Sequence, residues 1–262
     1  MADDINRAAD AIAWRDHYEA ERARLEAAGA YRRSDEHDAC GVGLVAAIDG
    51  APRREGVEIG VKALKSVWHR GAVEADGKTG DGAGIHIDVS QDFFREQIER
   101  TGHEPRGGHI GVGMIFLPRT DYGAQERCRT IVESEILRRG YYIYGWRQVP
   151  VNTDVIGDKA KATRPEIEQI MFTSGRDESP AALERDLFLV RRSIEKRARA
   201  ASLNDFYVCS LSGLSVVYKG MFLAQNIDDY FPDLRDERFI SKVAIYHQRY
   251  STNTFPTWWL AQ

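Results

Sequence analysis

A cysteine set among small residues is the first candidate for chemistry. Cys40 follows Ala39 and precedes Gly41 and Gly43, and the apolar run 42–48 predicts a buried strand after it. A thiol needs a base to become a strong nucleophile. If the bond before Cys40 is cut, its new α-amino group, with a pKa of about 7.7 to 8.0, becomes a base beside the sulfur. We predict that Cys40 is a nucleophile and the first mature residue; the alternative is a buried structural cysteine.

An arginine followed by short polar side chains is the second candidate. Arg249 lies near the end of a strand predicted over 242–250, and Tyr250, Ser251 and Thr252 follow it. A guanidinium binds a carboxylate through two parallel hydrogen bonds, which suits an amino acid with a free α-carboxylate. The alternative is a strand-end arginine in an ordinary ion pair.

A glycine-rich stretch, 80–84, is the third candidate. Glycines allow close backbone approach, so Gly80-Asp81-Gly82-Ala83-Gly84 could form a wall of a small-molecule site. It is not a phosphate-binding loop, because Lys78 and Thr79 precede the glycines instead of following them. The alternative is a plain turn before a strand.

The elements that must position these residues follow from periodicity and turn signals. Helices are expected at 8–28, 56–68, 91–100 and 123–139, and strands at 42–48, 85–89, 109–117, 141–149, 206–211, 214–218 and 242–250. The stretch 181–203 fits one long helix or a strand followed by a helix, and 150–175 is mixed, with a possible short helix from Pro165. The pattern indicates a layered protein of helices and substantial antiparallel sheet.

Two of these strands carry more detailed predictions. Ser212 and Gly213 separate the strands at 206–211 and 214–218, which is a hairpin signal. In the strand over 242–250, the alternation predicts that Val243 and Ile245 point inward, with His247 on the same face.

Composition, charge and cysteine spacing exclude several classes of function. The chain has 262 residues, 43% hydrophobic and 29% charged, with a net charge of −4 and a pI near 6.0, so no basic surface for nucleic acid is expected. No apolar run approaches the roughly 18 residues of a membrane span, and the polar start is unlike a secretory signal. Cys128 and Cys209 have no metal-ligand spacing and are expected to be structural. These features predict a cytoplasmic protein without a metal site.

Three separated motifs resemble those of class II glutamine amidotransferases, which are N-terminal-nucleophile hydrolases. They are Cys-Gly-Val-Gly at 40–43, His-Arg-Gly at 69–71 with Gly-Asp-Gly-Ala-Gly-Ile at 80–85, and His-Gln-Arg-Tyr-Ser-Thr at 247–252. The resemblance implies an α+β fold, a four-layer αββα sandwich that is incomplete at its C-terminus. It also implies a propeptide at 1–39 and an amidotransferase domain at 40–262.

Site roles come with the resemblance. Cys40 is the expected nucleophile, and Arg70 is expected to position its amino group. Arg249 is expected to bind the α-carboxylate of glutamine, with Tyr250, Ser251 and Thr252 lining the pocket. Two departures from the wider family stand out: an insertion separates Arg70-Gly71 from Asp81, and Asn253-Thr254 replaces the His-Gly of sugar-aminating relatives. Asp81 receives no role.

Within the family, 69–85, 217–221 and 250–258 are similar to the domain at the start of glutamate synthase large subunits. That likeness implies hydrolysis of L-glutamine to glutamate and ammonia through a Cys40 thioester, the ammonia then aminating 2-oxoglutarate. FMN, an iron–sulfur cluster and NADPH, delivered by a small subunit, are implied for the parent enzyme, and no cofactor is expected in this chain. The alternatives are another class II amidotransferase or a non-catalytic amino-acid-binding module.

The end of the chain carries one more expectation. Trp258 and Trp259 lie close to the last residue, an apolar stretch that suggests a longer natural chain. The family's oxyanion-hole Asn-Gly pair and the acid that binds the substrate α-amino group follow this region. Losing one oxyanion donor typically costs roughly 2.7 to 4 kcal/mol of transition-state stabilisation, so the 262-residue chain alone is expected to be nearly inactive.

Overall fold

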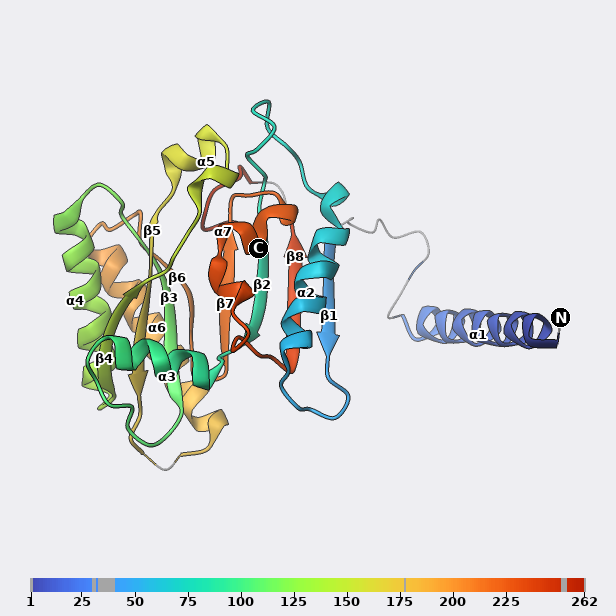
Figure 1. Cartoon of the computed structure of the whole chain (residues 1–262), viewed down its shortest axis with the longest axis horizontal. Helices are drawn as coiled ribbons and strands as arrows, with labels where there is room; N and C mark the ends of the chain where they lie inside the picture. Colours follow the sequence, from blue (N-terminus) through green and yellow to red (C-terminus); the bar gives the residue numbers. More distant parts are fainter. Residues whose placement is uncertain (1, 30–31, 33–40, 177, 251–253, 262) are drawn as a thin grey trace. The chain divides into compact units, whose positions relative to one another are not determined.

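The computed structural model describes residues 2–29, 32, 41–176, 178–250 and 254–261. The chain divides into two compact units, Met1–Ala39 and Cys40–Gln262. In the first unit, helix α1 (Ala2–Ala27) confirms the helix predicted over 8–28 and begins earlier (Figure 1). Its last carbonyls are followed by Gly29, whose φ of +73° is the left-handed conformation that glycine adopts without strain at a helix end.

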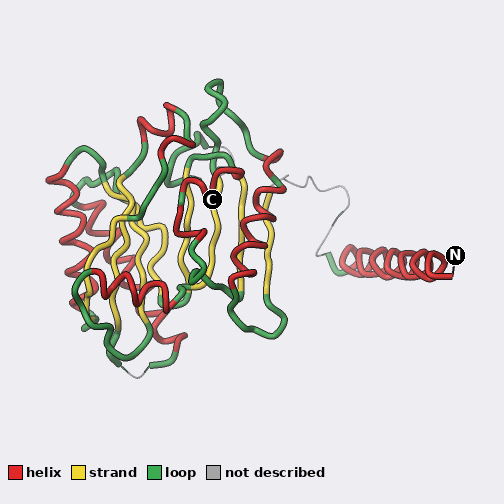
Figure 2. Tube along the Cα trace, in the orientation of Figure 1, coloured by secondary structure: helices red, strands yellow, loops and turns green. Residues whose placement is uncertain are grey.

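The second unit contains two four-stranded sheets in which all the neighbouring strands are antiparallel (Figures 1 and 2). The first sheet has the order β1 (Gly41–Ala46), β8 (Val243–Gln248), β2 (Ala83–Asp88) and β7 (Ser215–Gly220). The second has the order β4 (Tyr142–Gln148), β5 (Glu166–Thr173), β3 (Ile110–Leu117) and β6 (Tyr207–Ser212).

The second unit has six α-helices among its described residues, of which α2, α3 and α4 confirm the helices predicted over 56–68, 91–100 and 123–139, whereas α5 and α7 were not predicted. They are α2 (Arg54–Ser66), α3 (Gln91–Arg100), α4 (Tyr122–Arg138), α5 (Asp158–Thr163), α6 (Pro180–Ala200) and α7 (Ile227–Tyr230), with single 3₁₀ turns at Trp68–Arg70, Thr153–Val155, Ala224–Asn226 and Pro232–Arg235. The side chain of Asp121 caps α4 by accepting a 2.8 Å hydrogen bond from the backbone of Ala124. Ser179 caps α6 in the same way, and Pro180 occupies the first turn.

Two clusters of buried apolar side chains hold the sheets and helices of the second unit together. One joins residues of both sheets to α2 and α3; the other packs the second sheet against α4 and α6. Helix α2 buries Val57, Val61 and Leu64, while Gly60 allows close contact with Ala244 on β8. The result is a mixed helix-and-sheet fold, as predicted at the level of the α+β class.

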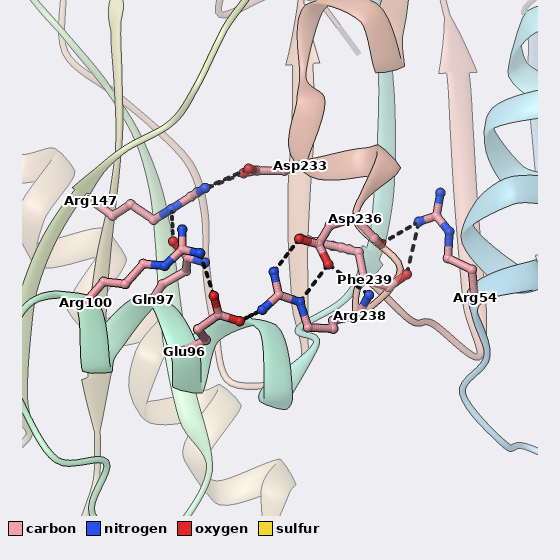
Figure 3. Close-up of polar contacts among 9 residues, drawn as sticks. All are labelled: Arg54, Glu96, Gln97, Arg100, Arg147, Asp233, Asp236, Arg238 and Phe239. Atoms are coloured by element: carbon pink, nitrogen blue, oxygen red, sulfur yellow. Dashed lines mark hydrogen bonds and ion pairs between the residues drawn. The ribbon is translucent and has the colours of Figure 1, made fainter.

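A polar network crosses the interior at the edge of the first cluster (Figure 3). Arg147 on β4 donates two hydrogen bonds, of 2.8 and 2.6 Å, to the carboxylate of Asp233. Asp233 also accepts a 2.9 Å bond from the hydroxyl of Tyr218, and Arg147 donates to Gln169 and Gln97. Both charges are buried, so each depends on the other for compensation.

The structure corrects three expectations. Strands β6 and β7 do not pair as a hairpin, because they enter different sheets. On β8, Ala244 and Gln248 point inward while Ile245 is exposed, opposite to the predicted face. The stretch from Pro165 forms strand β5 instead of a helix. Of the two alternatives for 181–203, the structure shows the single long helix, α6, which begins at Pro180. Among the described residues, no helix is both long and apolar enough to cross a membrane.

Candidate active site

The predicted site residues fall into two groups. Cys40, Ser251 and Thr252 lie outside the described residues. Arg70, Arg249 and Tyr250 are described, and all three lie at the end of the first sheet where β1 and β2 begin and β8 ends. The structure therefore brings together sequence segments that are separated by almost 180 residues.

Gly41 marks where the chain leaves the predicted nucleophile. It pairs with Gln248 across the β1–β8 ladder. A methyl group added to Gly41 would lie 3.2 Å from the Cβ atoms of both Arg70 and Gln248. Arg70 closes the short 3₁₀ turn that follows α2, and its side chain is exposed. The stem of Arg70 thus lies against the residue that follows Cys40, which favours its predicted positioning role.

Arg249 has a strained backbone. Its φ of +144° lies in a region that residues with a side chain rarely adopt, and such conformations cluster at functional sites. Its N–H donates a 2.9 Å hydrogen bond to the carbonyl oxygen of Gly82. Gly82 itself has a φ of +135°, and a methyl group there would lie 2.9 Å from the Cβ of Ala261. The glycine-rich stretch therefore holds Arg249 in place, instead of serving only as a turn.

The Arg249 side chain is available to an anion. It is partly buried, and its guanidinium lies 5.9 Å from the centre of the Tyr250 ring. Among the described residues, no carboxylate forms an ion pair with it. Tyr250 is fixed by an isolated β-bridge to Ala261. The alternative of a strand-end ion pair is not seen within the described part, and the carboxylate-binding role of Arg249 stays a prediction.

Two residues without a predicted role lie beside Arg249. Asp81 is only 5% exposed and Gln248 only 1%. Burial raises the pKa of the Asp81 carboxyl, while the Arg249 charge and the Gln248 side chain act in the opposite direction. Sequence patterns did not identify this pair, because an aspartate in a glycine-rich loop looks like a solvated turn residue.

The two other cysteines behave as the sequence predicted. Cys128 and Cys209 are both buried. Burial raises the pKa of Cys128 to about 11 and that of Cys209 to about 12, so both thiols stay protonated at neutral pH. Within the described ranges, no group of three or more His, Cys, Asp and Glu side chains is placed to hold a metal ion.

Comparison of the sequence with known proteins identifies the family to which the chain belongs. Residues 40–262 match the family described as class II glutamine amidotransferases. All 262 residues are 58% identical to the NADPH-type glutamate synthase large chain of Azospirillum brasilense, of which they cover 17%. The chain is 40% identical over 229 residues to ferredoxin-dependent glutamate synthase 2 of Synechocystis sp., covering 87% of this chain and 14% of that protein. It is 37% identical over 234 residues to the NADPH-type large chain of Bacillus subtilis, covering 89% and 15%.

These relatives are therefore much longer than the chain, which spans about one sixth of their length. The family match covers Arg70, Asp81 and Arg249 together with the two sheets that position them. The chain belongs to the class II glutamine amidotransferases.

Proposed function

We propose that the chain carries out the glutaminase half-reaction of a glutamate synthase. The Cys40 thiolate attacks the side-chain amide carbon of L-glutamine and forms a tetrahedral oxyanion. The oxyanion collapses, the C–N bond breaks, and ammonia leaves after taking a proton from the ammonium group of Cys40. Water then attacks the glutamyl thioester, and glutamate and the free thiol are released.

Arg249 supplies the observation that carries this proposal. Its guanidinium has no carboxylate partner among the described residues, and its backbone is held in a strained conformation by the Gly82 carbonyl. A guanidinium without a carboxylate partner in the described part of the chain, on a backbone held by Gly82, suits the α-carboxylate of glutamine. Tyr250, Ser251 and Thr252 follow it in the chain and would line the same pocket.

The propeptide is part of the same proposal. Removal of residues 1–39 would give Cys40 the α-amino group that serves as its base, and Arg70 would position that group. The match to the family begins at residue 40, and the chain divides into its two compact units between Ala39 and Cys40. Both observations support a 1–39 leader and a 40–262 domain.

A whole enzyme would use the ammonia for a second reaction. By analogy with the glutamate synthases above, the ammonia would aminate 2-oxoglutarate in further domains, with FMN, an iron–sulfur cluster and NADPH supplied through a small subunit. The described residues of this chain contribute no metal-ligand cluster to that chemistry. A cytoplasmic location and the four-layer αββα arrangement of the family belong to the same proposal.

A glutaminase assay on the full-length protein tests the proposal. The wild type should release glutamate and ammonia in equal amounts, and Cys40→Ala should abolish release. Cys128→Ala is the matched control, because this buried thiol lies on the inner face of α4 and its loss should leave turnover unchanged. Undiminished ammonia release by Cys40→Ala would overturn the mechanism. Glutamine binding by the wild type without any ammonia would favour a binding module instead.

A further inference from the structure

A buried carboxylate lies next to the proposed substrate-binding arginine without a defined function. Asp81 is 5% exposed, and among the described residues its Oδ1 atom has no hydrogen-bond partner. The Oε1 atom of Gln248, whose side chain is 1% exposed, also has no hydrogen-bond partner among the described residues. Buried polar atoms without partners are costly and rare, so a pair of them in one place needs an explanation.

Gly71 shows that the two side chains converge. A methyl group added to Gly71 would lie 1.9 Å from Nε2 of Gln248 and 3.0 Å from Oδ1 of Asp81. The amide and the carboxylate therefore face the same point, and only a glycine leaves room for them. The Nε2 atom of the Gln248 amide and the Oδ1 atom of Asp81 therefore lie near each other beside Gly71.

Both Gln248 and Asp81 are linked to Arg249 through the backbone. Gln248 directly precedes Arg249 and pairs with Gly41 on one side and Ala83 on the other. Gly82, which directly follows Asp81, accepts the Arg249 N–H. Asp81 itself is tied down by its own N–H, which donates to the carbonyl of Ala72 at 3.3 Å. Asp81 is thus at the junction of the segments that fix the strained arginine.

We propose that Asp81 is a positioning residue for glutamine binding: its carboxylate orients Gln248 and, with the Gly82 carbonyl, keeps Arg249 in the conformation that receives the substrate α-carboxylate. This inference rests on the proposed function. Asp81 contacts no reacting atom in this account. It acts through Arg249, so its loss should affect substrates only when they carry the group that Arg249 binds.

Two substrates separate positioning from a general structural effect. One is L-glutamine, and the other is 4-aminobutanamide, which is glutamine without its α-carboxylate. In the full-length protein, Asp81→Ala should lower kcat/KM for glutamine by about tenfold or more, mainly through KM, because the buried carboxylate that faces the Gln248 amide beside Arg249 is lost. For 4-aminobutanamide the same variant should change kcat/KM less than threefold.

Two further variants complete the experiment. Asp81→Asn keeps an oxygen that can accept from Gln248 and should recover most of the loss, which also covers the case in which Asp81→Ala fails to fold. Asp76→Ala is the matched control: Asp76 accepts hydrogen bonds from Lys78 and Thr79 in the same loop but is exposed. Its kinetics with both substrates should match the wild type.

The outcomes are distinguishable. Equal losses for the two substrates, or an unchanged KM for glutamine in Asp81→Ala, would overturn the positioning role while leaving glutamine hydrolysis intact. A wild-type protein that hydrolyses no glutamine would instead refute the proposed function on which the inference rests.

Discussion

The N–H of Arg249 donates a 2.9 Å hydrogen bond to the carbonyl oxygen of Gly82, and both residues have positive φ angles, of +144° and +135°. This contact ties the end of β8 to the start of β2. It joins two of the motifs that the sequence singled out, and it explains why a glycine-rich stretch and a distant arginine belong to one site.

Glutamine binding should require the guanidinium of Arg249, and a lysine ammonium group should not replace it. Arg249→Lys keeps the charge but loses the planar, two-pronged donor, so KM for glutamine should rise by about tenfold. Steady-state kinetics of the full-length protein measure this. Arg238→Lys, an arginine that pairs with Asp236 away from the site, is the control and should keep the wild-type KM. A KM within twofold of the wild type in Arg249→Lys would show that this side chain does not bind the carboxylate.

Gly82 should tolerate no side chain. Gly82→Ala would strain a φ of +135° and press a methyl group to within 2.9 Å of Ala261, so it should cost about 2 kcal/mol of the free energy of unfolding and weaken glutamine turnover. Gly77→Ala is the control in the same loop: its φ is +69°, but nothing lies within 4 Å of an added methyl group. It should cost only about 1 kcal/mol. Urea unfolding that ranks the two variants in the reverse order would contradict this packing.

The Arg147–Asp233 pair should be among the most sensitive contacts of the interior (Figure 3). Asp233→Ala leaves the buried Arg147 guanidinium without its counter-charge and should cost about 3 to 5 kcal/mol of unfolding free energy. Asp236→Ala removes one of the two carboxylates that pair with the more exposed Arg238, the other being that of Glu96, and should cost less than about 1 kcal/mol. Similar losses for both variants, measured by urea unfolding, would mean that the buried pair is not a major source of stability.

The elements that were predicted correctly are those whose buried residues recur with a regular local spacing. Helix α3 was predicted with its exact bounds, because Phe93, Phe94 and Ile98 recur at helical spacing and are all buried. Strand β5 was missed because its first half carries the polar residues Glu166, Glu168 and Gln169, of which the last two are buried. Their partners come from other elements, as in the ion pair of Glu168 with Arg129, and local periodicity does not reveal them.

Long-range packing accounts for the other errors. The turn at Ser212 is real, since its hydroxyl oxygen accepts from the N–H groups of Leu214 and Ser215 at 2.9 and 3.0 Å, but the strands on either side join different sheets. On β8, Gly60 of helix α2 packs against Ala244, which turns the larger Ile245 outward. Neither the sheet that a strand joins nor the face that it buries can be read from the residues of that strand alone.

The same distinction applies to the site. Arg249 was singled out by its residue type and the hydroxyl side chains that follow it, and the structure places it at the end of the first sheet, while its binding role stays a prediction. Its strained backbone and the burial of Asp81 were not, because both arise from contacts between 71–82 and the end of β8. Only the assembled sheet brings those segments together.

Thiol reactivity should differ sharply among the three cysteines. Because burial raises the pKa of Cys128 to about 11 and of Cys209 to about 12, neither should react with iodoacetamide in the native protein at pH 7.5. Both should react once the protein is unfolded in urea. Peptide mass spectrometry measures the modified fraction; rapid alkylation of either in the native state would contradict their burial.

The central claim is that Cys40, freed of its leader, attacks glutamine. Tandem mass spectrometry of the full-length protein after treatment with the glutamine analogue 6-diazo-5-oxo-L-norleucine tests it most directly. The account predicts a single adduct, on a peptide whose first residue is Cys40, and its suppression by excess glutamine. An adduct on another residue, a Cys40 still joined to Ala39 in protein that turns over glutamine, or labelling unaffected by glutamine would contradict it.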